Sequence, residues 1–360
     1  MKPIWKARDK RRWLRRQANR LRLQVSYRLG LLRVPGRPRI LMVEPTNECN
    51  LRCPLCPTGA GTLKRPKGQM SFEVYRDLLA ELDGALERLM LYNYGEPFLH
   101  PRVLDMVALA HQAEIHTRIS TNGLVFIRAR CADDLIASGL SYLRVSVDGA
   151  TPETYATYRV GGQLELVLEG IRLLQRRKAE LARSRPVVEL QFIAMRHNEH
   201  ELPAIRQMAQ EMGTLLRIKT VGLGDPNRRP TLGQPTLVQS ERQRWLPEQD
   251  TLRRYTECDG RLELAHARRP RRRCDHPWHR LVVNWDGQVT PCCYDRDGVY
   301  EFGNAAEGMA MVWNGERLRA FRKATRSPLP PMICRRCAVR LWGSPRLAWV
   351  EKPGNRRRSH

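Results

Sequence analysis

The stretch Ile-Leu-Met-Val-Glu-Pro-Thr-Asn-Glu-Cys-Asn-Leu-Arg-Cys-Pro-Leu-Cys at residues 40–56 decides how the fold of this chain is interpreted. Its first four residues form an apolar run, which is typical of a buried parallel strand. Three thiols follow on one loop, at Cys49, Cys53 and Cys56. Three thiolates at this spacing can hold three irons of a cubane cluster and leave the fourth iron without a protein ligand. Such an open iron is a place for chemistry.

From residue 39 to 222 the sequence alternates between short apolar runs and amphipathic stretches. Six apolar runs have the character of buried parallel strands, and they are residues 40–43, 89–91, 115–120, 142–147, 187–193 and 215–221. Six βα repeats with right-handed crossovers predict an α/β fold whose parallel sheet curls into a partial (β/α)6, TIM-like barrel. Sites in such barrels lie at the carboxyl ends of the strands, so the cysteine loop is expected at that end.

A second group of cysteines lies in the last quarter of the chain. Residues 223–273 are rich in Pro and Arg and predict a bridging segment without a core of its own. Five cysteines follow in a small domain over residues 274–345, at Cys274, Cys292, Cys293, Cys334 and Cys337. A β-hairpin is predicted at 281–292, ahead of a basic tail at 346–360. Four thiolates close the coordination of either zinc or a cubane cluster, and spacing alone does not choose between them.

Length and composition set the remaining bounds. The 360 residues suffice for one large domain and one smaller partner. No apolar run of about eighteen residues is present, and the amino terminus lacks the pattern of a secretory signal. We therefore expect a cytoplasmic protein. In a reducing compartment, ten clustered cysteines favour metal binding or chemistry over disulfides.

The net charge of +26 is concentrated at the amino terminus, where residues 1–40 carry fourteen Lys and Arg against one acid, Asp9. Apolar residues recur there at helical spacing, at Leu14, Ala18, Leu21, Val25, Leu29 and Leu32. We expect a basic amphipathic helix within residues 1–38. Three interpretations are open: peripheral contact of residues 1–36 with an anionic inner membrane face, packing on the main domain, or contact with RNA.

The cysteine loop and the motifs that follow it resemble the radical S-adenosylmethionine (radical SAM) superfamily. The supporting motifs stand at successive strand ends, and they are Gly95-Glu96-Pro97, Ser120-Thr121-Asn122-Gly123 and Ser146-Val147-Asp148-Gly149. The second cysteine group resembles the SPASM and twitch domains, which bind auxiliary clusters. The matching motifs are Trp285-Asp286-Gly287, Pro291-Cys292-Cys293, Gly303-Asn304, Val312-Trp313-Asn314 and Cys334-x2-Cys337.

The resemblance implies that the loop cysteines bind a [4Fe-4S] cluster whose open iron is chelated by S-adenosylmethionine. Reductive cleavage of that cofactor, fed by a donor such as flavodoxin or ferredoxin, would yield a 5′-deoxyadenosyl radical. Glu96 would accept hydrogen bonds from the methionine amino group beside Gly95. The ribose would lie near Ser120, Thr121 and Asn122, and the carboxylate near Ser146 and Arg159. Leu55 replaces an aromatic residue that is frequent in the family, so contact with adenine there would be apolar.

By the same resemblance, Cys274, Cys292, Cys334 and Cys337 would hold one auxiliary [4Fe-4S] cluster, whereas a full SPASM domain holds two. Cys293 is either a substitute ligand or a buried core thiol, and we favour the core thiol. We interpret Cys131 as a buried thiol and Cys258 as a linker thiol. His276 and His279 are interpreted as packed or hydrogen-bonded histidines. None of these five residues is predicted to bind metal.

The four-cysteine arrangement is similar to the twitch domain of a radical SAM aminocyclitol dehydrogenase, which implies hydrogen abstraction followed by electron transfer to the auxiliary cluster. The substrate class stays open among small molecules, peptides and lipids or lipid-linked sugars. Against a peptide, 38 residues ahead of the first strand are too few for a leader-binding domain. An alternative of another class is a zinc-containing RNA-binding protein, but the first loop offers three ligands where structural zinc needs four. A nucleic-acid partner is therefore not expected.

Overall fold

The computed structural model describes residues 7–127, 130–222, 243–253, 255–258, 261–264, 269–270, 274–335, 337, 341–342 and 348–353. The chain divides into two compact units. The first combines residues 1–48, 64–118 and 273–334, and the second combines residues 49–63, 119–272 and 335–360. The chain passes between the units several times, once within a single strand.

The first unit is built on short strands in the order β11-β10-β1-β2-β3. Their bounds are Ile40–Val43 for β1, Arg88–Leu91 for β2, His116–Thr121 for β3, Arg280–Val283 for β10 and Val289–Thr290 for β11. Strand β1 pairs in parallel with both β2 and β10, with Ile40 opposite Arg88 and Arg280. Strands β10 and β11 form an antiparallel pair, which confirms the predicted hairpin. The parallel pairing of β10 with β1 was not predicted.

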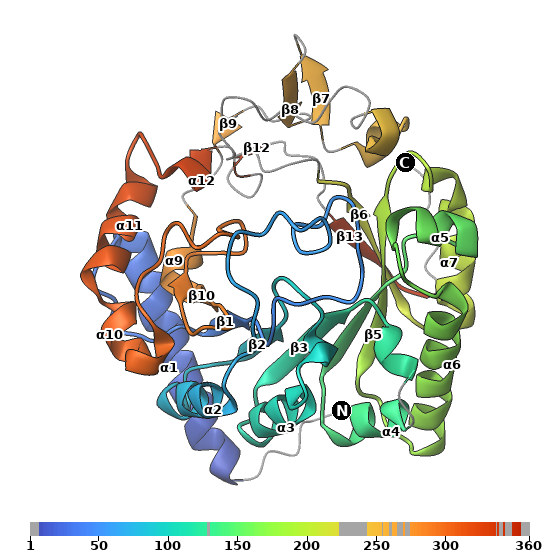
Figure 1. The fold of residues 1–360 in the computed structure, drawn as a ribbon. Coiled ribbons are helices and arrows are strands. Elements are labelled where there is room, and N and C mark those ends of the chain that lie inside the picture. The colour runs from blue at the N-terminus through green and yellow to red at the C-terminus, as the bar shows by residue number, and fades with distance from the viewer. Residues whose placement is uncertain are drawn as a thin grey trace. The chain divides into compact units, whose positions relative to one another are not determined.

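Helices of the first unit lie beside these strands (Figure 1). Their bounds are Ala7–Leu29 for α1, Phe72–Glu81 for α2, Val103–Gln112 for α3, His276–His279 for α9, Met309–Trp313 for α10, Glu316–Arg326 for α11 and Met332–Arg335 for α12, whose last residue belongs to the second unit. Helix α2 begins after Ser71, whose side chain accepts a hydrogen bond from the Val74 amide. The α2–α3 contact is fixed by buried Tyr75, whose hydroxyl donates to the Met106 carbonyl.

The second unit holds the end of β3 and the strand order β4-β5-β6-β13. These strands are Tyr142–Ser146 for β4, Val187–Ala194 for β5, Leu215–Thr220 for β6 and Ala348–Glu351 for β13. Strands β4, β5 and β6 are parallel, and β13 closes the edge of β6 in the antiparallel direction. Two small antiparallel pairs complete the unit: Tyr255–Cys258 (β7) with Arg261–Leu264 (β8), and Arg269–Pro270 (β9) with Leu341–Trp342 (β12).

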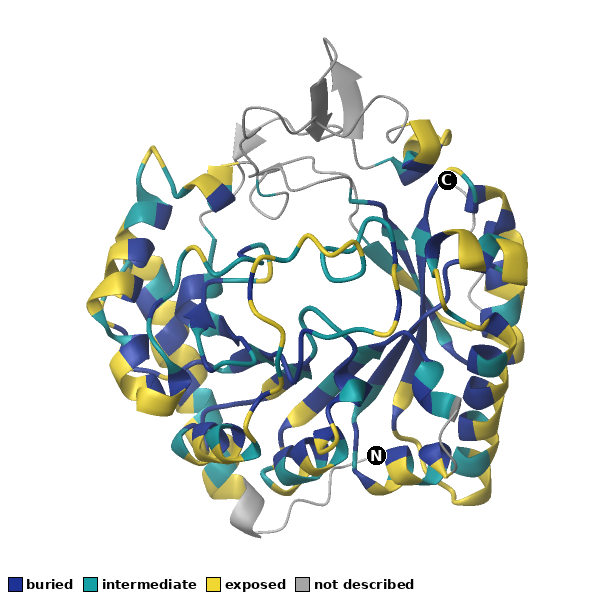
Figure 2. Cartoon of the chain, in the orientation of Figure 1, coloured by how far each residue is buried: buried dark blue, intermediate teal, exposed yellow. Residues whose placement is uncertain are grey.

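Helices of the second unit flank these parallel strands (Figure 1). They are Cys131–Ala137 (α4), Pro152–Tyr158 (α5), Leu164–Glu180 (α6) and Leu202–Glu211 (α7). Strand residues are buried and the outer faces of the helices are exposed (Figure 2), because each amphipathic helix turns its apolar face to the sheet. The predicted α/β class with a mostly parallel sheet is confirmed, and the predicted domain boundaries stay a prediction.

Part of the predicted bridging segment packs into the core of the second unit. Residues 223–242 lie outside the described part, but Trp245 is fully buried and Leu252 is 3% exposed. Trp245 packs edge-on against Tyr158 of α5, with 5.7 Å between ring centroids. Residues 243–253 therefore contribute to the core of the second unit, a contact that the sequence did not predict. Pro and Arg content reflects the exposed positions of such a segment and misses one buried aromatic anchor.

Candidate functional site

The cysteine loop lies in the second unit, and its thiols are not in disulfides. Cys53 is buried, while Cys49 and Cys56 are partly exposed. The Cys56 amide donates to the Cys53 carbonyl at 3.1 Å, which forms a turn, and the Leu51 amide points at Cys49 Sγ from 3.4 Å. Donors aimed at sulfur favour the thiolate form that iron binds. This set of three soft ligands therefore fits a cubane cluster with one open iron.

A buried ion pair stands beside Cys53. The Arg159 guanidinium donates to Asp148 Oδ2 at 2.6 Å from Nε, and its Nη1 lies 3.8 Å from Cys53 Sγ. Asp148 is 0% exposed and also accepts a hydrogen bond from the Ile193 amide at 2.6 Å. Burial alone would lower the pKa of Arg159, but the Asp148 carboxylate raises it well above its usual range. Arg159 is therefore a fixed cation next to the middle thiol of the loop.

Burial has the opposite effect on that thiol. It raises the pKa of Cys53, and the positive charge of Arg159 partly offsets the rise. Arg159 therefore favours the thiolate form of Cys53, which is the form that binds metal.

An apolar cluster covers the loop within the same unit. Its buried members are Leu51, Cys53, Tyr158, Met195, Val221 and Trp245. Leu55 and the other two loop cysteines pack against this cluster. Leu55, the predicted adenine contact, thus lies on the apolar cluster that buries Cys53.

The predicted ribose and carboxylate residues lie at the ends of β3 and β4. Asn122 is 5% exposed and donates to Asn50 Oδ1 at 2.7 Å, with its amide nitrogen 4.0 Å from Cys49 Sγ. It therefore ties the end of β3 to the cysteine loop. Ser146 is 5% exposed and lies within 3.5 Å of the Gln191 amide nitrogen. Ser120 and Thr121 are consecutive residues of β3, of which Thr121 is buried.

Gly95 and Glu96 lie in the first unit. Gly95 has φ +84°, and a Cβ atom there would stand 2.5 Å from the Thr46 carbonyl oxygen and 2.6 Å from that of Glu48. The Glu96 amide donates to the Glu48 carbonyl at 2.7 Å. A glycine is required because the turn after β2 touches the backbone that leads into the cysteine loop.

Of the predicted auxiliary ligands, Cys274, Cys292 and Cys334 lie in the first unit and Cys337 lies in the second. All four are partly exposed. Ligand atoms of Cys274, Asp275 and His276 lie within 4.8 Å of one another, so His276, predicted to be a packed residue, stands within reach of a metal at Cys274. Burial lowers the pKa of His276 to about 4, which keeps the ring neutral.

The interpretation of Cys293 as a buried thiol is wrong, because Cys293 is exposed. It followed from alternation along an extended strand, but β11 ends at Thr290 and residues 291–294 form a turn. Cys131 is buried in α4 as predicted. The side chain of Cys258 lies outside the described part of the chain.

Sequence reasoning missed Asp148 and Trp245. The sequence does contain a signal for Asp148. This acid ends an apolar strand in the motif at residues 146–149, and Arg159 follows it after one short helix. Trp245 has no signal in the sequence, because its partners Tyr158 and Met195 are far away along the chain.

The α/β fold and the three-thiol loop after β1 are together typical of one class, enzymes that use an iron-sulfur cluster. Family comparison agrees. The model of the radical SAM superfamily matches residues 43–208, and that of the SPASM iron-sulfur cluster-binding domain matches residues 274–338. The chain belongs to the radical SAM superfamily and carries a SPASM domain, so it is an enzyme whose cofactors are S-adenosylmethionine and iron-sulfur clusters.

Similar proteins include the tungsten-containing aldehyde ferredoxin oxidoreductase cofactor-modifying protein of Pyrococcus furiosus, 24% identical over 84% of this chain and 88% of the relative. The PqqA peptide cyclase of Gluconobacter oxydans is 26% identical over 89% of each chain. Among solved structures, Streptococcus suis SuiB bound to precursor peptide SuiA superposes with TM-score 0.59 at 13% identity, over 89% of this chain and 75% of the other. This superposition confirms the predicted partial-barrel fold.

Proposed function

We propose that this enzyme removes a hydrogen atom from a carbon of a peptide substrate and completes a two-electron oxidation of that peptide. Three relatives or structural neighbours named for a peptide support this substrate class: the PqqA peptide cyclases, SuiB with its precursor peptide, and anSMEcpe with a bound peptide. The main structural support for this reaction is the cysteine loop, whose three free thiols lie beside the Arg159 cation.

The proposed ligands of the catalytic cluster are Cys49, Cys53 and Cys56. When bound, the cofactors supply a 5′-deoxyadenosyl radical for hydrogen abstraction and, at a second cluster, an acceptor for one electron. The substrate would lose one hydrogen atom, one electron and one proton, which amounts to two hydrogens. The electron that starts each turnover would come from a flavodoxin or ferredoxin.

The chain's own residues would orient the cofactor and exclude water. Arg159 carries the fixed positive charge that a methionine carboxylate needs, and Ser146 offers a hydroxyl to the same group. Asn122 donates to Asn50 beside Cys49, and Ser120, Thr121 and Asn122 are proposed to face the ribose. Glu96 is proposed to accept from the methionine amino group. The apolar cluster around Leu55 would keep water from a reactive carbon radical.

Replacement of Cys53 by Ala tests the catalytic ligands. We expect loss of roughly half of the iron and of all 5′-deoxyadenosine formation, because two thiolates do not retain a cubane. Iron, sulfide and 5′-deoxyadenosine are measured after anaerobic purification. Cys131→Ala, which removes a buried thiol outside the loop, is the matched control. It should keep the iron content and the 5′-deoxyadenosine formation of wild type. Undiminished 5′-deoxyadenosine in the Cys53 variant would contradict the assignment.

Replacement of Cys334 by Ala tests the auxiliary ligands. About half of the iron should be lost while some uncoupled cleavage of S-adenosylmethionine persists, because the first cluster is intact. Cys293→Ala is the control on the same domain and should retain all iron, since that thiol is exposed and not a proposed ligand. Equal iron in the Cys334 variant and wild type would argue against the auxiliary site.

The substrate class is tested by fractionating an extract of the source cells into peptides and lipids. The peptide fraction should raise 5′-deoxyadenosine formation above the uncoupled rate, and protease treatment should abolish the effect. Stimulation by the lipid fraction alone would favour a lipid or lipid-linked sugar and overturn the peptide proposal.

A further inference from the structure

Helix α1 is held in the first unit by a face that its apolar pattern did not predict. Leu23 and Ser26 are fully buried, and Asn19 is 5% exposed and exchanges two hydrogen bonds with the backbone of Arg37. On the same side, Arg20 forms a two-point ion pair with Glu87. The helix is therefore an integral part of the unit.

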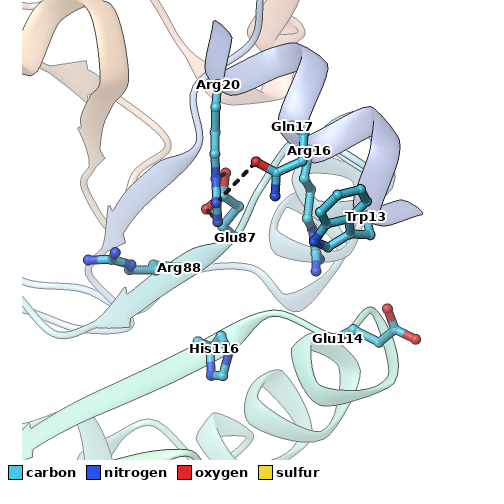
Figure 3. Close-up of a pocket in the computed structure, with 8 residues that line it drawn as sticks. All are labelled: Trp13, Arg16, Gln17, Arg20, Glu87, Arg88, Glu114 and His116. Carbon is cyan, nitrogen blue, oxygen red and sulfur yellow. Dashed lines mark hydrogen bonds and ion pairs between the residues drawn. The ribbon is translucent and has the colours of Figure 1, made fainter. Parts of the chain in front are cut away.

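Figure 3 shows the contact at the beginning of β2 and β3. Four residues of α1 line a cavity of about 400 Å³ together with four residues at or just before the first residues of β2 and β3. They are Trp13, Arg16, Gln17, Arg20, Glu87, Arg88, Glu114 and His116. The Arg16 guanidinium donates to the Ala113 carbonyl at 3.2 Å. Charged residues of α1 thus face the protein at this point.

The opposite face of α1 is apolar and exposed. Leu14, Leu21, Val25 and Leu29 are 58%, 65%, 41% and 69% exposed, and Ala18 lies among them. Leu14 and Leu23 are nine residues apart, which at about 100° per residue places them on opposite sides of the helix. The predicted apolar stripe exists, but it faces away from the first unit that the helix packs on. We call these five residues the apolar row.

Basic side chains border the apolar row. Lys10, Arg11, Arg15, Arg22 and Arg28 are exposed, and none forms an ion pair with a residue in the described part of the chain. By contrast, Arg12 on the packed side pairs with Asp83, and Arg20 pairs with Glu87. The charges near the row are therefore left for an external anion, and arginine forks suit phosphate oxygens.

We propose that the apolar row and its basic border dock α1 on the surface of an anionic lipid bilayer. Leucine and valine side chains would enter the boundary between headgroups and acyl chains, and the long basic side chains would reach the lipid phosphates. Charge complementarity favours this occupant over a second copy of the chain, because two copies would bring their basic borders together. No helix in the described part of the chain is long and apolar enough to span a membrane, so the contact would be peripheral. The proposal is independent of the proposed reaction.

Sedimentation of the whole iron-loaded protein with vesicles tests the proposal. Binding to phosphatidylcholine vesicles with about one third phosphatidylglycerol is compared with binding to pure phosphatidylcholine, at low and high salt. We expect at least tenfold stronger binding to the anionic vesicles at low salt, reduced by high salt. Equal binding to both vesicle types, or no binding to either, would overturn the proposal.

The double variant Leu21→Glu/Leu29→Glu should weaken anionic vesicle binding at least tenfold. Its matched control is Val299→Glu/Met311→Glu, which changes two residues of the same unit that are 74% and 70% exposed and should leave binding unchanged.

A third variant, Arg11→Gln/Arg15→Gln/Arg22→Gln, tests the basic border and should lose the preference for anionic lipid. Thermal melting and iron content show whether each variant is folded. Unchanged binding by the Leu21/Leu29 variant would count against the apolar row. A different result would identify a second copy of the chain as the occupant of the apolar row. In that case wild type binds no vesicles and is dimeric in solution, and the Leu21/Leu29 variant is monomeric.

Discussion

At the scale of single residues, the Asp148–Arg159 pair is the feature that most constrains the cysteine loop. Arg159 has one carboxylate partner on one side and the Cys53 sulfur on the other, and both of its neighbours are buried. A buried charge without its partner is costly, because desolvation is not repaid. The Asp148–Arg159 pair thus affects both the stability of the second unit and the charge next to Cys53, a proposed cluster ligand.

Asp148→Asn should destabilise the second unit by about 3–5 kcal/mol, since it leaves a buried guanidinium uncompensated. The free energy of unfolding is measured by denaturant titration of wild type and variant. Asp77→Asn, which breaks the exposed pair with Arg76, is the control and should have no measurable effect. Similar stability of the two variants would mean that Arg159 does not depend on Asp148.

At the scale of elements, short turns decide where the loops lie. Gly95 is the sharpest case, because it combines a left-handed φ with backbone oxygens within 2.6 Å of a potential Cβ. Gly61 has a similar φ of +66° but nothing within 4 Å of a potential Cβ. A comparison of the two positions therefore distinguishes the cost of a left-handed backbone from the cost of a steric clash.

Gly61→Ala should cost about 1–2 kcal/mol, the penalty of a left-handed conformation for a residue with a side chain. Gly95→Ala should cost clearly more, because the turn after β2 must move away from Thr46 and Glu48. Unfolding free energies of the two variants check this order. Equal losses would show that the turn can shift at no cost.

At the scale of the whole molecule, each unit contains one buried glutamate shared by two arginines. Glu87 accepts from Arg20 and Arg39 in the first unit, and Glu189 accepts from Arg144 and Arg217 in the second. Burial alone would raise the pKa of each carboxyl, but the hydrogen bonds from arginine lower the pKa below its ordinary value. Protonation of these carboxyls should therefore destabilise both units.

We expect the stability of both units to fall as the pH drops below about 5. The sign follows from the lowered pKa, because the unfolded carboxyl takes up protons at a higher pH than the folded one. Thermal melting between pH 7 and pH 3 measures the effect. Glu189→Gln should be less stable at pH 7 and should lose less stability on acidification, whereas Glu165→Gln, an exposed position on α6, should follow wild type. An unchanged pH profile in the Glu189 variant would rule out its contribution.

Strand positions and the order of motifs were predictable from the sequence. Apolar runs predicted all six strands β1 to β6 to within one residue at each end, because buried strands are marked by apolar residues. The exposure of Cys293 was not predictable, since a turn interrupts the alternation that the prediction assumed. The predicted cofactor contacts stay predictions.

By itself, the sequence determined that the chain is a radical SAM enzyme with a second cysteine domain, because covalent spacing places three thiols on one loop after a buried strand. Only the tertiary structure decided which side chains surround those thiols and which face of α1 is covered. Periodicity locates an apolar face but does not state what packs on it. The surface of the first unit accepts Leu23, Ser26 and Asn19, so the apolar row of α1 is left exposed. Asp148, Arg159 and Trp245 meet the loop because the strands and helices between them fold back on one another.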